Sequence, residues 1–172
     1  MNQSYSFDPK SRVWSRPIST PLPYSDGDEI EDYLLTTLRS VEDVSSQSSE
    51  LIAAIKDWPS EYHFSPARHN LLRFINIGPA HRVLELGCGC GAITRYLGER
   101  GAQVMAVEGN LRRAEIAAER CRDLPNVQVY CDNLVDLIME DRFDFVTLIG
   151  VLEYAPCFVM NADPVGHVLS LV

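Results

Sequence analysis

The sequence predicts an α/β fold built on a Rossmann-like parallel sheet, with a helical region in front of it. Short apolar strands alternate with helical patterns from Arg82 onward, and residues 143–149 are almost continuously apolar. A strand without polar alternation is covered on both faces, as in a parallel sheet between two layers of helices. Four such strands, in the spatial order 3-2-1-4, therefore form the expected sheet.

We expect three segments along the chain. Residues 1–27 hold four prolines, which disfavour a helix or a central strand, and should form an extended arm. Residues 28–79 should form a helical cap, and residues 80–172 a Rossmann-like domain that is incomplete at its C-terminus. A chain of 172 residues suits this arrangement of one compact domain with an arm.

Apolar residues at helical spacing predict two helices in the cap, separated by the serine-rich run 45–49. We expect Pro59 to end the second of them. Ser65 as the N-cap and Pro66 in the first turn then predict a third helix, which extends through Ile75.

The Rossmann-like part is expected to alternate from strand to helix. Asn110 should cap a helix over 111–122, whose arginines we expect on a solvated, self-paired face. Asp163 should start a last helix that continues to residue 172. The other expected elements are strands over 82–86, 103–107, 127–131 and 143–149, a helix between Gly91 and Gly101, and a short helix over 134–139.

The last expected strand has an unpaired edge. Free backbone groups beside apolar side chains invite aggregation. We therefore expect another part to cover this edge, which could be a second copy in a homo-oligomer, the N-terminal arm, or a missing C-terminal region of a longer gene product.

Charge and cysteine content argue against several classes of protein. The chain has 24 acidic and 15 basic residues, and its basic residues do not cluster, so we expect no nucleic-acid partner. No apolar run approaches the ~20 residues of a membrane helix, and the N-terminus lacks the apolar core of a signal peptide. Five cysteines without a CxxC pair predict neither a disulfide framework nor a metal site, and fit free thiols in the cytoplasm.

Glycine or polar residues follow three successive strands. The glycine turn at 87–91 lets the backbone bend sharply and lets a ligand lie against bare main chain. Glu108 ends the next strand, where a carboxylate can accept both hydroxyls of a ribose. Asp132 and Asn133 end the third strand and suit the amino group and ring nitrogens of adenine. Because all three lie at the carboxyl ends of parallel strands, we expect an adenosine-containing ligand.

Two ligands of that kind compete. Gly87, Gly89 and Ala92 satisfy a dinucleotide fingerprint, with Glu108 as its acidic partner. Glu85, two residues before the turn, argues against a dinucleotide because a carboxylate in the crevice would repel a pyrophosphate. The same carboxylate would favour the ammonium and the nearby sulfonium of S-adenosylmethionine, which carries adenosine, a positive centre and no phosphate.

Together these motifs resemble a class I S-adenosylmethionine-dependent methyltransferase over about residues 80–172. The resemblance implies that Gly87 and Gly89 lie under the methionyl part, Glu108 on the ribose and Asp132 near the adenine. The family's sheet has seven strands, and the last three, which help to form the acceptor pocket, have no counterpart here. The predicted cofactor-binding residues are Glu85, Gly87, Cys88, Gly89, Gly91, Glu108, Gly109, Asn110, Asp132, Asn133, Gly150, Val151 and Arg68.

The stretch 62–73 is similar to a segment of methyltransferases associated with bacterial surface-polysaccharide synthesis, often fused to glycosyltransferases, which implies a sugar or glycan acceptor. The cofactor supplies the activated methyl group, so the protein must hold the acceptor in line and, for an oxygen acceptor, supply a base. Candidates for catalysis are His63, Glu153 and Tyr154. Arg68 opposes the dipole of its helix, which indicates an anionic partner such as the cofactor carboxylate.

Two other functions stay open at this point. The chain could be a truncated cofactor-binding module without turnover of its own. It could also be an NAD-binding Rossmann domain, in which the glycine turn holds a pyrophosphate.

Overall fold

The computed structural model describes residues 5–16, 24–137, 141–160 and 162–170. Its centre is a sheet in the order β1-β2-β5-β4-β3-β6. The last four positions form a parallel sheet in the predicted order 3-2-1-4, which confirms the α/β, Rossmann-like fold class. The parallel strands are β3 (Arg82–Leu86), β4 (Gln103–Glu108), β5 (Val127–Cys131) and β6 (Phe145–Thr147).

The N-terminal arm contributes two strands, which corrects the expectation that prolines keep it out of the sheet. Strands β1 (Ser6–Asp8) and β2 (Val13–Ser15) form an antiparallel hairpin. Strand β2 also pairs in parallel with β5, so the arm lies at the end of the sheet opposite β6. Pro9 lies in the turn between the two strands, and Pro17, Pro21 and Pro23 lie outside the described residues. Burial of Val13, together with the stacking of Trp14 on Tyr130, stabilises β2 in the sheet.

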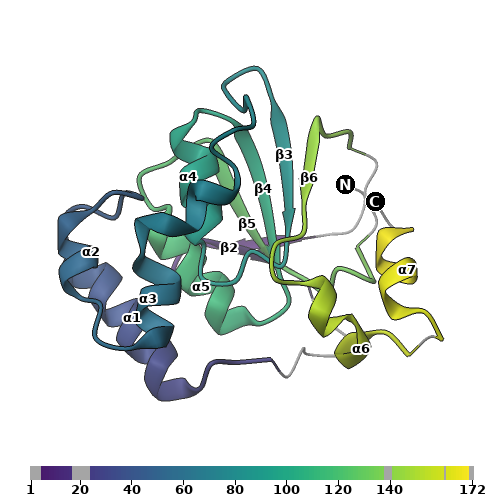
Figure 1. Cartoon of the computed structure of the whole chain (residues 1–172), viewed down its shortest axis with the longest axis horizontal. Coiled ribbons are helices and arrows are strands. Elements are labelled where there is room, and N and C mark those ends of the chain that lie inside the picture. The colour runs from purple at the N-terminus through teal and green to yellow at the C-terminus, as the bar shows by residue number, and fades with distance from the viewer. Residues whose placement is uncertain (1–4, 17–23, 138–140, 161, 171–172) are drawn as a thin grey trace.

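The helices α1 to α5 lie on one side of the sheet in Figure 1. They are α1 (Asp28–Ser40), α2 (Ser49–Ala53), α3 (Trp58–Phe64), α4 (Ala92–Glu99) and α5 (Leu111–Arg120). A 3-10 helix, η1 (Pro66–Leu71), follows α3 in place of the longer helix expected through Ile75. Apolar side chains of α1, α2 and α3 share one core with Ile116 of α5, so the cap packs onto the sheet through α5.

Two expectations for these helices are wrong. Pro59 does not end a helix but lies in the first turn of α3, where Asp57 caps the helix and a proline needs no hydrogen-bond donor. The expectation of a solvated arginine face on α5 is wrong for Arg113 and Arg120, which contact Asp26 and the His63 carbonyl. Arg113 and Arg120 are only 6% and 2% exposed. Arg112 and Arg122 pair with Glu115 and Glu119, as expected.

The opposite side of the sheet carries η2 (Leu152–Tyr154), α6 (Ala155–Phe158) and α7 (Pro164–Leu169), of which Figure 1 shows α6 and α7 beside β6. Asp163 caps α7 as predicted, but the helix ends at Leu169. The expected helix over 134–139 is a turn in its described part, and residues 138–140 and 171–172 lie outside the described residues. Strand β6 is shorter than expected and partly exposed, since it forms the edge of the sheet.

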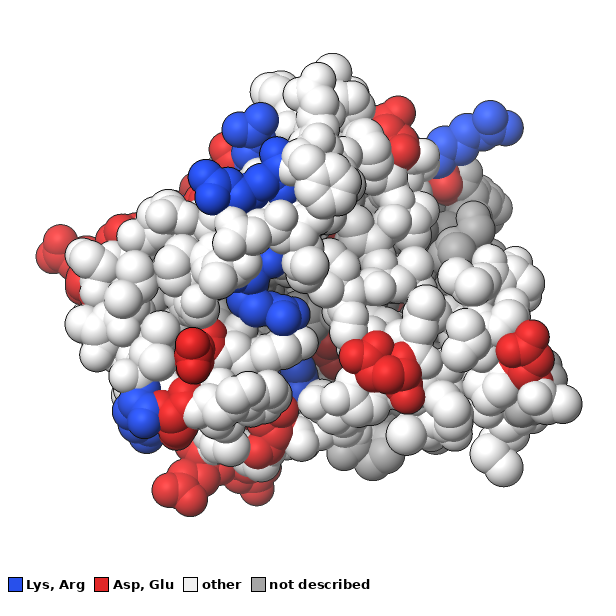
Figure 2. Space-filling model, viewed as in Figure 1, with Lys and Arg blue, Asp and Glu red and all other residues white. Residues whose placement is uncertain are grey.

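No helix among the described residues is long and apolar enough to cross a membrane. In Figure 2 several basic side chains gather in the upper left part of the face that it presents, and acidic side chains are spread over its lower half.

We predict that Arg16→Gln lowers the free energy of unfolding by about 1–3 kcal/mol, because it removes a charged hydrogen bond from a buried carboxylate. Arg16 Nε lies 2.7 Å from Asp132 Oδ2, and the Asp132 side chain is 1% exposed. Urea denaturation measures the change. Arg12→Gln, an exposed site in the same hairpin, is the matched control and should leave the midpoint unchanged. Equal urea midpoints for the two variants would show that this ion pair does not stabilise the folded chain.

Candidate functional site

The glycine turn after β3 has the backbone shape that only glycine adopts without strain. Gly87, Gly89 and Gly91 have φ values of 71°, 56° and 80°. A Cβ atom on Gly87 would lie 2.5 Å from Val151 Cγ2, and one on Gly89 would lie 2.9 Å from Arg113 Nη2. Glycine at these two positions therefore admits the close approach of Val151 and Arg113, and both glycines also line the space above the strand ends.

The amides of this turn already donate to protein acceptors. The Gly87 and Cys88 amides donate to the Val107 carbonyl at 2.8 and 3.0 Å. The Gly89 amide donates to Glu108 Oε2 at 2.8 Å, and the Gly91 amide donates to the Cys88 carbonyl at 3.1 Å. These four N–H groups are thus used to fix the turn and the Glu108 carboxylate.

Two adjoining cavities lie over the turn and share Gly87, Gly89 and Gly150. Cavity A has a volume of about 250 Å³ and also contacts Glu108, Gly109, Asp132, Val151 and Cys157. Cavity B has a volume of about 270 Å³ and also contacts Glu85, Cys88, Arg68, His63, Glu153, Asp26, Trp58 and Tyr62. Tyr24, Arg113 and Tyr154 contact both.

Glu85 is the buried acid at the inner end of cavity B. It is 3% exposed, and burial raises the pKa of its carboxyl to about 8. Thr94 in α4 donates a hydrogen bond to Glu85 Oε2 at 2.7 Å, which leaves Oε1 for a ligand. A positively charged group entering the cavity would favour the ionised form of this carboxyl.

Glu108 is the buried acid of cavity A. Its Oε1 accepts a hydrogen bond from the Asn110 amide at 3.0 Å, and its Oε2 accepts one from Gly89. Burial raises the pKa of Glu108, and the Arg113 guanidinium opposes that shift. Both carboxylate oxygens keep lone pairs that a pair of hydroxyls can use.

Asp132, also in cavity A, is held by the N-terminal arm. Tyr5 Oη and Arg16 Nε donate to Asp132 Oδ2, and the Asn133 amide donates to Oδ1 at 2.8 Å. Burial, together with Asp132, raises the pKa of Tyr5 to about 12. The arm therefore forms one side of the region where the sequence places the adenine.

Most predicted site residues contact one of the two cavities. Those that do not are Gly91, Asn110 and Asn133. Gly91 is the N-cap of α4, and a Cβ there would lie 2.8 Å from Ala117 Cα. Asn110 caps α5 through the Arg112 and Arg113 amides and donates from Nδ2 to the Tyr24 carbonyl at 3.0 Å. The structure gives these residues roles in shaping the turn and the loops.

Sequence reasoning missed Tyr24, Asp26 and Arg113. Arg113 Nη1 lies 3.0 Å from Asp26 Oδ2, and its guanidinium lies over the Tyr24 ring at 4.8 Å from the centroid. Arg113 Nε is buried with no hydrogen-bond partner among the described residues. The only signal in the sequence was the excess of arginines on α5, which looks the same for a solvated face.

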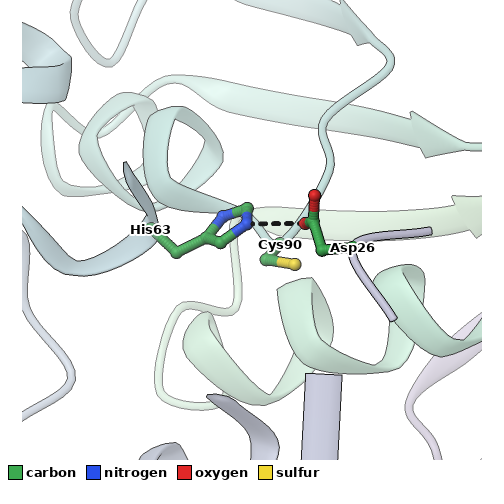
Figure 3. A group of neighbouring side chains, drawn as sticks. All are labelled: Asp26, His63 and Cys90. Atoms are coloured by element: carbon green, nitrogen blue, oxygen red, sulfur yellow. Dashed lines mark hydrogen bonds and ion pairs between the residues drawn. The ribbon is translucent and has the colours of Figure 1, made fainter. Parts of the chain in front are cut away.

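Asp26, His63 and Cys90 lie together at one side of cavity B (Figure 3), with ligand atoms within 4.8 Å of one another. His63 Nε2 is 3.0 Å from Asp26 Oδ2, the oxygen that Arg113 also contacts. Burial raises the pKa of the Cys90 thiol far above its usual range, so the sulfur carries a proton. A cation here would face the Arg113 guanidinium, and the Asp26 carboxylate already pairs with His63 and Arg113.

Arg68 reaches cavity B beside an aromatic ring. Its guanidinium carbon lies 3.8 Å from the centroid of Tyr62, and Nη2 donates to Tyr62 Oη at 2.9 Å. Its Nε is buried and has no partner among the described residues. A donor without a partner in a cavity wall fits an anionic ligand group, as the sequence predicts.

A comparison with protein families matches residues 83–162 to a family described as a methyltransferase domain. These residues form a methyltransferase domain, as predicted from the sequence, and they make up less than half of the chain.

Curated relatives of the methyltransferase domain act on different acceptors. The chain is 51% identical over 47 residues to ribosomal RNA small subunit methyltransferase A of Streptococcus equi subsp. zooepidemicus, which covers 27% of this chain and 16% of that protein. It is 33% identical over 82 residues to (S)-coclaurine N-methyltransferase of Thalictrum flavum subsp. glaucum, covering 45% and 23%. The chain thus spans less than a quarter of the length of these relatives.

Among solved structures, the methyltransferase domain is similar to CalS10, an amino pentose methyltransferase of Micromonospora echinaspora with S-adenosylmethionine bound. The identity is 22% and the TM-score 0.44, and the match covers 60% of this chain and 40% of that one.

Proposed function

We propose that the chain binds S-adenosylmethionine across cavities A and B and that the protein transfers its methyl group to a sugar or glycan acceptor. When bound, the cofactor supplies an already activated methyl group on its sulfonium. The protein's own residues then have to bind the cofactor, orient the acceptor and exclude water.

The observation that carries this proposal is the hydrogen bonding of the glycine turn. A dinucleotide site uses the amides of such a turn to hold a pyrophosphate. Here the amides of Gly87, Cys88, Gly89 and Gly91 donate to protein oxygens, and Gly89 donates to a carboxylate. A phosphate would have to displace Glu108 and come near Glu85. This arrangement supports a ligand with a positive centre over NAD.

The donor set fits the parts of the cofactor in a definite order. In cavity A, Glu108 would accept the ribose hydroxyls and Asp132 would lie toward the adenine. In cavity B, Glu85 would pair with the ammonium and Arg68 with the carboxylate of the methionyl part. Gly87, which lines both cavities, would lie under the link between the two halves.

The sugar or glycan acceptor rests on the resemblance of residues 62–73 to methyltransferases of surface-polysaccharide synthesis. Trp58 and Tyr62 support it, since they line cavity B with ring centroids 5.3 Å apart and aromatic faces suit the C–H faces of a sugar ring. We also propose a cytoplasmic location, which the five free cysteines support.

We expect S-adenosylmethionine and S-adenosylhomocysteine to raise the melting temperature of the purified chain, and NAD to leave it unchanged. Protection by NAD alone would contradict the proposal. Release of S-adenosylhomocysteine with candidate acceptors then separates a methyltransferase from a module that only binds the cofactor. Binding without turnover over a broad acceptor panel would favour the module.

A further inference from the structure

Cavity B extends from an exposed aromatic rim to a buried carboxyl. Trp58 is 69% exposed and Tyr154 37% exposed, whereas Glu85 at the other end is 3% exposed. Tyr154 pairs with Tyr24 at a centroid distance of 4.7 Å. An acceptor that enters past these rings would approach the end of the cavity where the proposed cofactor carries its methyl group.

His63 lines this cavity and is oriented by Asp26 (Figure 3). The Asp26 carboxylate is ionised, since its contacts with His63 and Arg113 lower its pKa. An ionised Asp26 accepts the proton of His63 Nε2, which leaves Nδ1 as the basic nitrogen. No described residue contacts Nδ1 with a hydrogen bond.

The groups around His63 keep it neutral in the empty site. Burial lowers its pKa, and Arg113 and Arg120 of α5 act in the same direction. Asp26, from the segment before α1, opposes them, and Cys90 of the glycine turn carries a proton. Arg120 Nη1 also donates to the His63 carbonyl at 2.8 Å, which fixes the backbone that carries the ring.

We infer that cavity B takes a hydroxyl-bearing ring as methyl acceptor, that His63 is the base that receives the hydroxyl proton, and that Asp26 is its positioning residue. This inference rests on the proposed function and adds the acceptor atom and the base. An amine acceptor reacts through a free lone pair and needs no such base, whereas a neutral hydroxyl must lose its proton.

Methyl transfer to a hydroxyl acceptor can proceed with these groups alone. The acceptor oxygen forms a bond to the methyl carbon as the carbon–sulfur bond breaks, and the electron pair of that bond stays on sulfur. The hydroxyl proton goes to Nδ1 of His63, so the positive charge moves from the sulfonium to an imidazolium next to Asp26. Loss of that proton to water restores the neutral histidine.

The first test measures the protonation state of His63 and needs no acceptor. In protein labelled with ¹⁵N at histidine, we expect the His63 signal at pH 7.5 to be that of a neutral ring with its proton on Nε2. His63→Gln assigns the signal, because a glutamine amide can still donate to Asp26. Asp26→Asn should lower the pKa of His63 further, and His167→Gln, outside both cavities, should leave the signal unchanged. A proton on Nδ1, or a charged ring at this pH, would overturn the inference.

The second test measures release of S-adenosylhomocysteine with methyl glycosides, nucleoside diphosphate sugars, catechols, benzylamine and glucosamine. We expect turnover with the hydroxyl acceptors, and the sugar and catechol arms distinguish the two sources of a hydroxylated ring. His63→Gln should reduce turnover by ~100-fold or more with the Kd for S-adenosylmethionine changed by less than twofold, and His167→Gln should keep full turnover. Three results would overturn the inference: turnover with the amines only, no turnover with any of the hydroxyl compounds, or an undiminished rate of turnover in His63→Gln. Absence of cofactor binding contradicts the proposed function instead.

Discussion

Gly87→Ala is expected to weaken binding of S-adenosylmethionine by at least ~100-fold, the largest effect of any single substitution in the turn. The new Cβ would lie 2.5 Å from Val151 Cγ2, so Val151 and the η2 segment must move. Val151 lines cavity A, and Gly87 lines both cavities, so any such movement changes the floor on which the ligand lies. Titration calorimetry measures the affinity.

Gly27→Ala is the matched control for this experiment. Gly27 also has a positive φ, 102°, but a Cβ there meets nothing within 4 Å, and neither cavity includes it. Gly27→Ala should lose about 1–2 kcal/mol of stability because of its positive φ. Gly87→Ala should lose more because of the contact with Val151, and only Gly87→Ala should lose affinity. An unchanged Kd for Gly87→Ala would mean that the cofactor does not lie against the glycine turn.

The sequence was sufficient for the strand ends and the residues placed there. Strands at 82–86 and 127–131 have the predicted bounds, because each is a short apolar run bounded by turn residues. Once the strands are parallel, their carboxyl ends must meet at one edge, which brings Glu108 and Asp132 into one cavity without further information.

Sequence patterns did not predict the contacts between segments that are far apart in the chain. Asp26 precedes α1 and meets His63 and Arg113, which lie 37 and 87 positions further along the chain. The helical pattern of α5 shows that charged side chains are present but not that other segments bury two of them. Arg113 donates to the Asp26 carboxylate, which precedes the cap, and Arg120 donates to the His63 carbonyl within the cap, so both arginines have an acceptor where they are buried.

The strands of the N-terminal arm also depend on contacts with distant residues, which the sequence pattern did not predict. Its prolines were counted over all of residues 1–27, whereas the two strands are only three residues each. What places β2 in the sheet is a tertiary contact, the stacking of Trp14 on Tyr130, together with the hold of Arg16 on Asp132. Tyr130 and Asp132 are both far from the arm in the sequence. The proline content of the arm therefore led to the wrong prediction for its secondary structure.

Glu85→Gln is expected to change how stability and affinity depend on pH. The pKa of Glu85 is about 8 in the folded protein and near its ordinary value of 4.5 when unfolded. Between these values the folded chain holds a proton that the unfolded chain has lost, so raising the pH favours unfolding. The stability contributed by the protonated form is present below the unfolded pKa and is lost as the pH rises through about 8. The loss is on the order of 5 kcal/mol and is absent from Glu85→Gln.

Binding of a cation reverses this dependence, because the ligand favours the ionised carboxyl. The affinity of the native protein for S-adenosylmethionine should therefore rise with pH up to about 8, with release of a proton, whereas the Glu85→Gln affinity should be weaker and follow only the titration of the ligand itself. Calorimetry in two buffers of different ionisation enthalpy measures the released proton, and Glu61→Gln, an exposed carboxyl on α3, should behave like the native protein. If the native and Glu85→Gln proteins showed the same pH profile of affinity, the positive end of the ligand would not lie at Glu85. The charge of Glu85 would then no longer favour S-adenosylmethionine over a dinucleotide in cavity B.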